Sequence, residues 1–156
     1  MNRKSVRPIY QILLPCLVVC LAVALGALAK NARNFAGDYR IVHVTEKGDS
    51  VEIQMSLRVI NVSGEDVKDA TISLRSSLRP LPRGEALDWE KEQPTFKGLT
   101  LNYNEHNIVP PLEATFTIPA REYDLWRKGA GPNFIIDYKD ASGESRRERI
   151  ELIPKR

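Results

Sequence analysis

Cysteine is almost absent from this sequence, and its two copies, Cys16 and Cys20, both lie in an apolar run near the N-terminus. Residues 30–156 contain no cysteine, which excludes disulfides, thiolate metal ligands and a cysteine nucleophile from that part of the chain. A lipoprotein signal is not expected, because Pro15 and Val19 stand where such a signal has a small residue before its cysteine. Residues 30–156 must therefore rely on an apolar core for their stability.

Histidine is equally scarce, and the common catalytic and metal-binding motifs are missing. His43 and His106 are far apart, whereas metal-binding histidines usually recur at short spacings. No serine lies in a Gly-x-Ser-x-Gly sequence. The stretch with Asp137, Asp140 and Glu144 lacks the ligand spacing of an EF-hand, although a calcium site that also uses backbone carbonyls stays open. The sequence predicts no catalytic residue, metal ligand or cofactor, and it indicates a protein that is not an enzyme.

Excess charge is also missing once the N-terminus is set aside. Arg3, Lys4 and Arg7 supply the whole formal net charge of +3, so the remaining chain has equal numbers of basic and acidic residues. A neutral domain has no general electrostatic attraction for nucleic acid or anionic lipid. We expect no nucleic-acid partner.

Residues 1–29 have the organisation of a secretory signal. Basic residues precede an uncharged run from Ile12 to Ala29, and Ala27 and Ala29 place small side chains where signal peptidase cleaves. We predict cleavage between Ala29 and Lys30, with Gly26 as the alternative site. An uncleaved anchor is the alternative, because the run approaches the roughly 20 apolar residues that span a bilayer. The sequence thus predicts an exported chain, periplasmic or extracellular, or one attached to the membrane only by this N-terminal helix.

After a short polar lead at residues 30–37, residues 38–156 form one domain in which apolar and polar residues alternate. Alternation of this kind predicts β-strands with one buried face. The clearest run consists of Val51, Ile53, Met55, Leu57 and Val59. Further strands are expected at residues 38–45, 70–74, 95–103, 112–118, 134–138 and 149–153. Ser63–Asp66 is expected to make a hairpin of the two strands beside it, Asp140–Gly143 to make a second hairpin, and Arg121–Lys128 to form one or two helical turns.

About seven short strands with frequent turn signals predict an antiparallel β-sandwich. Ile60–Leu74 resembles the strand–turn–strand of bacterial cell-envelope domains of immunoglobulin-like or fibronectin-III-like type, in which an Asn-x-Ser-Gly-x-Asp turn precedes alternating apolar residues. The resemblance covers residues 39–74 and, more loosely, 134–152. The proline- and arginine-rich stretch at residues 76–103 departs from it. The resemblance implies an all-β, immunoglobulin-like sandwich and implies no functional residue.

The sequence favours a binding or structural module of the cell envelope that contacts an unidentified envelope protein through its loops or an edge strand. The alternative is a carbohydrate-recognition module, in which exposed aromatic rings stack on a glycan. The candidates for such ligand-facing aromatics are Trp89, Tyr103 and Trp126. Trp126 could instead pack with Tyr123 at one end of the domain, because the two are spaced for the same side of a helical turn.

Overall fold

The most regular alternation in the sequence forms a central strand. The computed structural model describes residues 33–78, 86–103 and 110–155, all within one unit, Arg33–Arg156. In it β2 spans Ser50–Asn61, and the predicted face of this strand is buried: Val51, Ile53, Met55, Leu57 and Val59. The predicted cleavage site between Ala29 and Lys30 lies outside the described residues.

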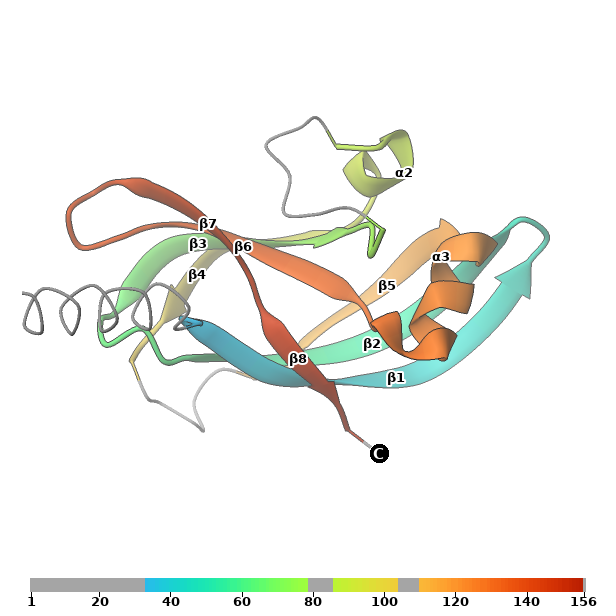
Figure 1. Ribbon diagram of the computed structural model, residues 1–156, viewed down its shortest axis with the longest axis horizontal. Helices are drawn as coiled ribbons and strands as arrows, with labels where there is room; N and C mark the ends of the chain where they lie inside the picture. The colour runs from blue at the N-terminus through green and yellow to red at the C-terminus, as the bar shows by residue number, and fades with distance from the viewer. Residues whose placement is uncertain (1–32, 79–85, 104–109, 156) are drawn as a thin grey trace, which may run out of the picture. The chain divides into compact units, whose positions relative to one another are not determined.

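The first sheet has the strand order β5-β2-β1-β8 (Figure 1). β1 (Phe35–Lys47) forms a long antiparallel hairpin with β2, and β5 (Leu112–Pro119) pairs with the other side of β2. β8 (Glu151–Pro154) runs parallel to β1. This sheet is therefore mixed, and the expectation of a wholly antiparallel fold was wrong. The chain enters β8 from the other sheet and not through a hairpin, so β8 is not forced to run antiparallel to its neighbour.

The second sheet has the strand order β4-β3-β6-β7, and all of its neighbours are antiparallel. Its strands are β3 (Val67–Arg75), β4 (Thr95–Leu101), β6 (Asn133–Lys139) and β7 (Ser145–Arg149). The predicted hairpin at Asp140–Gly143 joins β6 to β7. Gly98 has a φ of 66° and lies where the β3–β4 register shifts, so β4 has a bulge there.

The two four-stranded sheets pack face to face around one apolar core. Ring contacts join strands of different sheets: the centroids of Phe35 and Tyr138 are 5.0 Å apart, and those of Phe116 and Phe134 are 5.5 Å apart. The cluster of buried side chains draws on β-strands from both sheets. The fold is thus mostly β, as the alternation predicted.

The residues between β2 and β3 do not form the expected hairpin, because the two strands belong to different sheets. The apolar faces of β2 and β3 face each other across the core, so each strand finds its pairing partners elsewhere. Asn61 holds the corner between the sheets: its Nδ2 donates to the carbonyl oxygens of Glu65 and Leu101, both at 2.7 Å, and its Oδ1 accepts from Ser63.

The segment expected as one closing strand at residues 149–153 is divided at Ile150. This residue is 2% exposed, and its N–H donates to the carbonyl oxygen of Phe134 at 3.0 Å. Burial of Ile150 carries the chain from β7 in one sheet to β8 in the other. Alternation alone does not reveal such a crossing, because both halves keep an extended backbone.

Short helices complete the fold. α2 (Asp88–Lys91) precedes β4, while α3 (Ala120–Leu125) and the π-helical turn η1 (Trp126–Ala130) connect β5 to β6 where helical turns were predicted. The N–H of Ala120 donates to the carbonyl oxygen of Asp49 in the β1–β2 turn, so α3 begins beside that turn (Figure 1).

Candidate functional site: the open edge of strand β5

β5 is an edge strand with unusually regular pairing. Its pairing with β2 runs without a bulge from Leu112 opposite Leu57 to Pro119 opposite Ser50. No other strand in the described part of the chain pairs with its far side. Pro111 and Pro119 stand at its two ends, and proline is found in sheets mainly on edges because it has no N–H to donate.

Gln93 caps one residue of this edge with its side chain. Its Nε2 donates to the carbonyl oxygen of Thr117 at 2.8 Å, and its Oε1 accepts the N–H of Thr117 at 3.0 Å. The amide thus takes the place that the backbone of a neighbouring strand would have. Both backbone groups of Thr117 therefore point away from β2, and the two-residue period of a strand puts those of Glu113 and Thr115 on the same side.

The outward N–H and C=O groups of Glu113 and Thr115 have no hydrogen-bond partner among the described residues. Both residues are exposed. Exposed backbone groups in a regular edge form a template on which another extended segment can pair. We call this stretch, Glu113–Thr115, the open edge.

Buried charge holds Gln93 in position. Gln93 is 7% exposed, and its Nε2 also donates to the carbonyl oxygen of Trp89. Glu90 lies in α2 next to Trp89, and its carboxylate is buried. This carboxylate accepts hydrogen bonds from the N–H groups of Ser76 and Leu87 at 2.8 and 2.7 Å. Arg75 pairs with it at 3.2 Å. A buried carboxylate is stable only when it is hydrogen-bonded and paired in this way, so the segment that carries Gln93 is fixed to the end of β3.

A second buried carboxylate, that of Glu122 in α3, binds the same segment. It accepts from Ser76 Oγ at 2.9 Å, from the N–H of Ser77 at 2.5 Å and from the indole N–H of Trp126 at 3.2 Å. The two glutamates therefore clamp the residues after β3 between α2 and α3.

Half-buried apolar side chains lie beside the open edge. β4 faces β5 across the core, as the 6.5 Å ring contact between Phe96 and Phe116 shows. Between these two edges lie four apolar side chains that pack on the core but stay partly exposed, here called the apolar seam: Phe96, Leu99, Leu112 and Ala114. A strand added to β5 would direct every second side chain over this seam.

The other edges carry the usual obstructions to pairing. β4 has the bulge at Gly98, and β3 opposite it has an extra residue near Asp69, whose φ is 53°. β7 has five residues, three of them arginine. β8 has four residues and ends at Pro154, and the part of β1 that extends beyond it has a bulge at Val42. Among the described edge strands, β5 alone combines a length of eight residues with an unbroken register.

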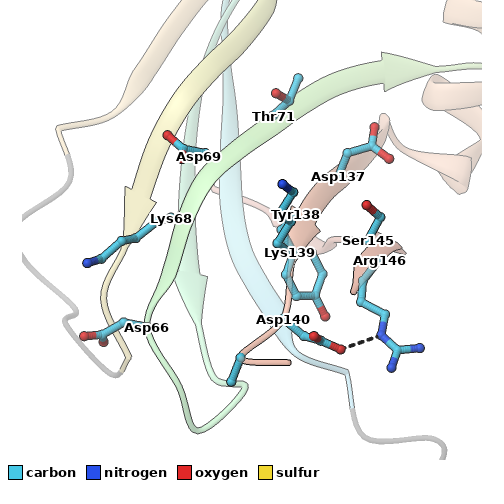
Figure 2. A pocket seen from close by; sticks show the side chains of 11 residues that line it. Asp66, Lys68, Asp69, Thr71, Asp137, Tyr138, Lys139, Asp140, Ser145 and Arg146 are labelled. Atoms are coloured by element: carbon cyan, nitrogen blue, oxygen red, sulfur yellow. Dashed lines mark hydrogen bonds and ion pairs between the residues drawn. The ribbon is translucent and has the colours of Figure 1, made fainter. Parts of the chain in front are cut away.

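A groove of about 550 Å³ lies between the start of β3 and the β6–β7 hairpin (Figure 2). β3 pairs with β6 only from Thr71 onward, and the bulge at Asp69 in the pairing of β3 with β4 lies just before that point. The side chains around the groove carry both signs of charge: Asp66, Lys68, Asp69, Asp137, Lys139, Asp140 and Arg146.

Most of the carboxylates of this groove already have partners. Arg146 Nε lies 2.8 Å from Asp140, Arg147 Nε lies 2.6 Å from Asp137, and Asp66 accepts the N–H of Tyr103. Hydrogen bonds from Ser142 and Arg146 lower the pKa of Asp140 to about 2. No three His, Asp or Glu side chains in the described ranges are arranged to hold a metal ion. The groove is therefore a weaker candidate for a binding site than the open edge.

The three aromatic residues considered for a sugar platform lie apart. Trp126 is 6% exposed, and its indole N–H donates to Ser77 and Glu122, so its ring faces the interior. Trp89 in α2 is half-buried against the core at the start of β4. Tyr103 is 46% exposed and follows the other end of β4.

The sequence did not indicate Gln93, Glu113 or Thr115. A partial signal was available, because prolines on both sides of an alternating run indicate an edge strand. The role of Gln93 had no such signal, since its partner lies 24 residues away and the contact depends on the tertiary fold.

None of the helices in the described ranges is long and apolar enough to cross a membrane.

No protein-family model matches the sequence, and no curated protein sequence matches it. Among solved structures, the chain is similar to a GH20 exo-β-N-acetylglucosaminidase from Vibrio harveyi, both as an inactive mutant and in complex with N-acetylglucosamine. The sequence identity is 14% to the mutant and 16% to the complex, and the TM-score is 0.40 in both comparisons. Each comparison covers 78% of this chain and 18% of the enzyme's chain.

Proposed function

We propose that this chain is an exported, non-catalytic interaction module of the cell envelope, with an immunoglobulin-like β-sandwich whose open edge receives an extended segment of a protein. The observation that carries the proposal is the regular, unpaired stretch Glu113–Thr115 in a fold whose other edges are obstructed. Strand addition of this kind takes its affinity from backbone hydrogen bonds and its specificity from alternate side chains.

The strength of such binding depends on the unpaired backbone groups of β5 and on the apolar seam beside them. Glu113 and Thr115 each present one N–H and one C=O, and each hydrogen bond contributes about 0.5–1.5 kcal/mol net. Partial coverage of the apolar seam adds to this, at about 25 cal/mol per Å² of apolar surface removed from water. The seam also favours a segment with an apolar residue at every second position.

The proposed location rests on the N-terminal sequence. A basic start, an uncharged run and small residues at Ala27 and Ala29 support export and processing before Lys30. The partner would then be met in the periplasm or outside the cell. If residues 1–29 are not cleaved, they attach the domain to the membrane, and the open edge binds its partner at the membrane surface.

Site-specific photocrosslinking in the cells that make the full chain tests the proposal. Benzoylphenylalanine in place of Glu113 is expected to give a discrete crosslinked product, and Thr115→Pro in the same chain is expected to abolish it. The proline removes an N–H that points away from β2, so the β2–β5 pairing is kept.

The matched position is Lys139, which is exposed and lies at the groove. Crosslinking from Lys139 and none from Glu113 would contradict the proposal and place the binding site in the groove. A product from Glu113 that survives Thr115→Pro would also contradict it, because backbone pairing at the edge would then play no part.

A further inference from the structure

We infer that the segment received at the open edge is β5 of a second copy of this chain, paired antiparallel about a two-fold axis at Ala114. This inference rests on the proposed strand addition and names its partner. A two-fold interface uses the same patch on both copies, so the edge must be complementary to itself. Three features of β5 meet that requirement in one register.

The first feature is the position of the unpaired backbone groups. With the axis at Ala114, Glu113 of each copy lies opposite Thr115 of the other copy. These are the residues whose N–H and C=O groups point outward without a partner in the described structure. Directly opposite residues of an antiparallel pair can exchange both hydrogen bonds, so all of these groups are satisfied together.

The second feature is the way the pairing ends. In the same register, Thr117 lies opposite Pro111 of the second copy. Thr117 has already used both backbone groups on Gln93, and Pro111 has no N–H to donate. Pro111 also directly precedes the first residue of β5, so the second strand ends where the side chain of Gln93 occupies the edge.

The third feature is that neighbouring registers fail. An axis at Glu113 places two carboxylates directly opposite each other and sets Thr115 against Pro111, which lacks the N–H. Like charges in directly opposite positions are destabilising. An axis at Thr115 places Glu113 against Thr117, whose backbone groups Gln93 already holds. Only the register at Ala114 uses every open group.

Side chains are compatible with this register. Ala114 at the axis is small, and Leu112 lies opposite Phe116 of the other copy, so the two apolar seams meet and cover each other. The contact is nevertheless short, and it buries less than the roughly 1,200–2,000 Å² of a stable interface. The association is therefore weak, with a Kd expected in the micromolar to millimolar range.

A disulfide at the axis tests the register. Because Glu113 and Thr115 make the hydrogen bonds, the two Ala114 residues form a non-hydrogen-bonded pair with Cα atoms about 4.5 Å apart, within the range that a disulfide bridges. In a full chain with Cys16→Ser and Cys20→Ser, Ala114→Cys is expected to form a covalent dimer on mild oxidation. The matched control is Thr117→Cys, on the same strand and more exposed, which is expected to stay monomeric.

Sedimentation velocity over a concentration series tests the equilibrium without a crosslink. The parent chain is expected to dimerise as its concentration rises, Thr115→Val to dimerise equally because it keeps the N–H, and Thr115→Pro to remain monomeric with an unchanged far-UV spectrum. Equal crosslinking of the Ala114 and Thr117 cysteine variants, or dimerisation of Thr115→Pro, would overturn the inference.

A labelled peptide with the sequence of residues 111–119 separates this inference from the proposed function. If the chain stays monomeric at all concentrations yet binds the peptide, and Thr115→Pro abolishes that binding, the edge accepts strands but a second copy is not its partner. If the chain neither dimerises nor binds the peptide, and Glu113 gives no crosslinked product in cells, both proposals fail.

Discussion

Removal of the Glu122 carboxylate should strongly destabilise the fold, although this residue is charged and lies in a short helix. In the folded chain it accepts hydrogen bonds from Ser76 Oγ, Ser77 N–H and the Trp126 indole. Trp126 keeps a second partner, Ser77 Oγ at 3.0 Å, when the carboxylate is lost. Glu122→Ala therefore leaves the buried hydroxyl of Ser76 and the half-buried N–H of Ser77 without an acceptor. At about 1–3 kcal/mol for the buried donor and less for the half-buried one, the free energy of unfolding should fall by about 2–4 kcal/mol.

Glu122→Gln separates the loss of hydrogen bonds from the loss of charge. The amide oxygen can accept from Ser77 and Trp126, and the amide N–H can donate to the hydroxyl of Ser76 once that hydroxyl rotates. All three contacts survive without the assistance of the negative charge, so the expected cost is below about 1.5 kcal/mol.

Urea denaturation at neutral pH, followed by both tryptophan fluorescence and far-UV circular dichroism, measures these differences if the two probes agree. Asp124→Ala, an exposed position in the same helix, is the control and should change stability by less than about 0.5 kcal/mol. A cost below about 1 kcal/mol for Glu122→Ala, or equal costs for the alanine and glutamine variants, would refute the view that this buried acceptor clamps α3 to the end of β3.

Two further predictions concern exposed backbone and exposed charge. Gln93→Ala should speed amide hydrogen exchange at Thr117 by about tenfold or more, because that N–H loses its acceptor; unchanged protection would show that Gln93 does not cap the edge. Asp140→Asn should lower the melting temperature clearly at pH 7 and much less at pH 2. The folded pKa of Asp140 is about 2, below its ordinary 3.8, so the carboxylate stabilises the fold above pH 4 and loses that effect as the pH falls towards 2. A difference that stays constant from pH 7 to pH 2 would contradict this.

Local patterns in the sequence predicted local structure well. The alternation from Val51 to Val59 identified the buried face of β2 because a strand repeats every two residues. A glycine inside an alternating run, such as Gly98, is a local signal of the same kind, because the positive φ of a bulge is easy only for glycine. The Asp140–Gly143 hairpin was likewise predictable, since Asp140 accepts hydrogen bonds from the backbone of Ser142 and Glu144 within the turn itself.

Pairing between distant segments was not predictable from those patterns. β2 and β3 are adjacent in sequence and both amphipathic, which fits a hairpin and also fits two strands that face each other across a core. Burial of Ile150 decides where the chain changes sheets, and this depends on β6 being its neighbour. The buried glutamates at positions 90 and 122 looked like surface charge in the sequence, because their acceptor role requires backbone N–H groups from the end of β3.

The outward backbone groups of β5 are blocked at Thr117 and open at Thr115 and Glu113. Such an edge differs from one that is protected along its whole length. A bulge, a charge or a proline within the strand is enough to prevent pairing with another strand, as the other edges of this fold illustrate. Here a side-chain amide occupies Thr117 and is held there by a buried network, while Glu113 and Thr115 stay exposed beside half-buried apolar side chains. Gln93 therefore fixes where an added strand must end, and a fixed end selects one register out of several. Selection of a register is useful to a docking site and has no value for an edge that is meant to stay unpaired.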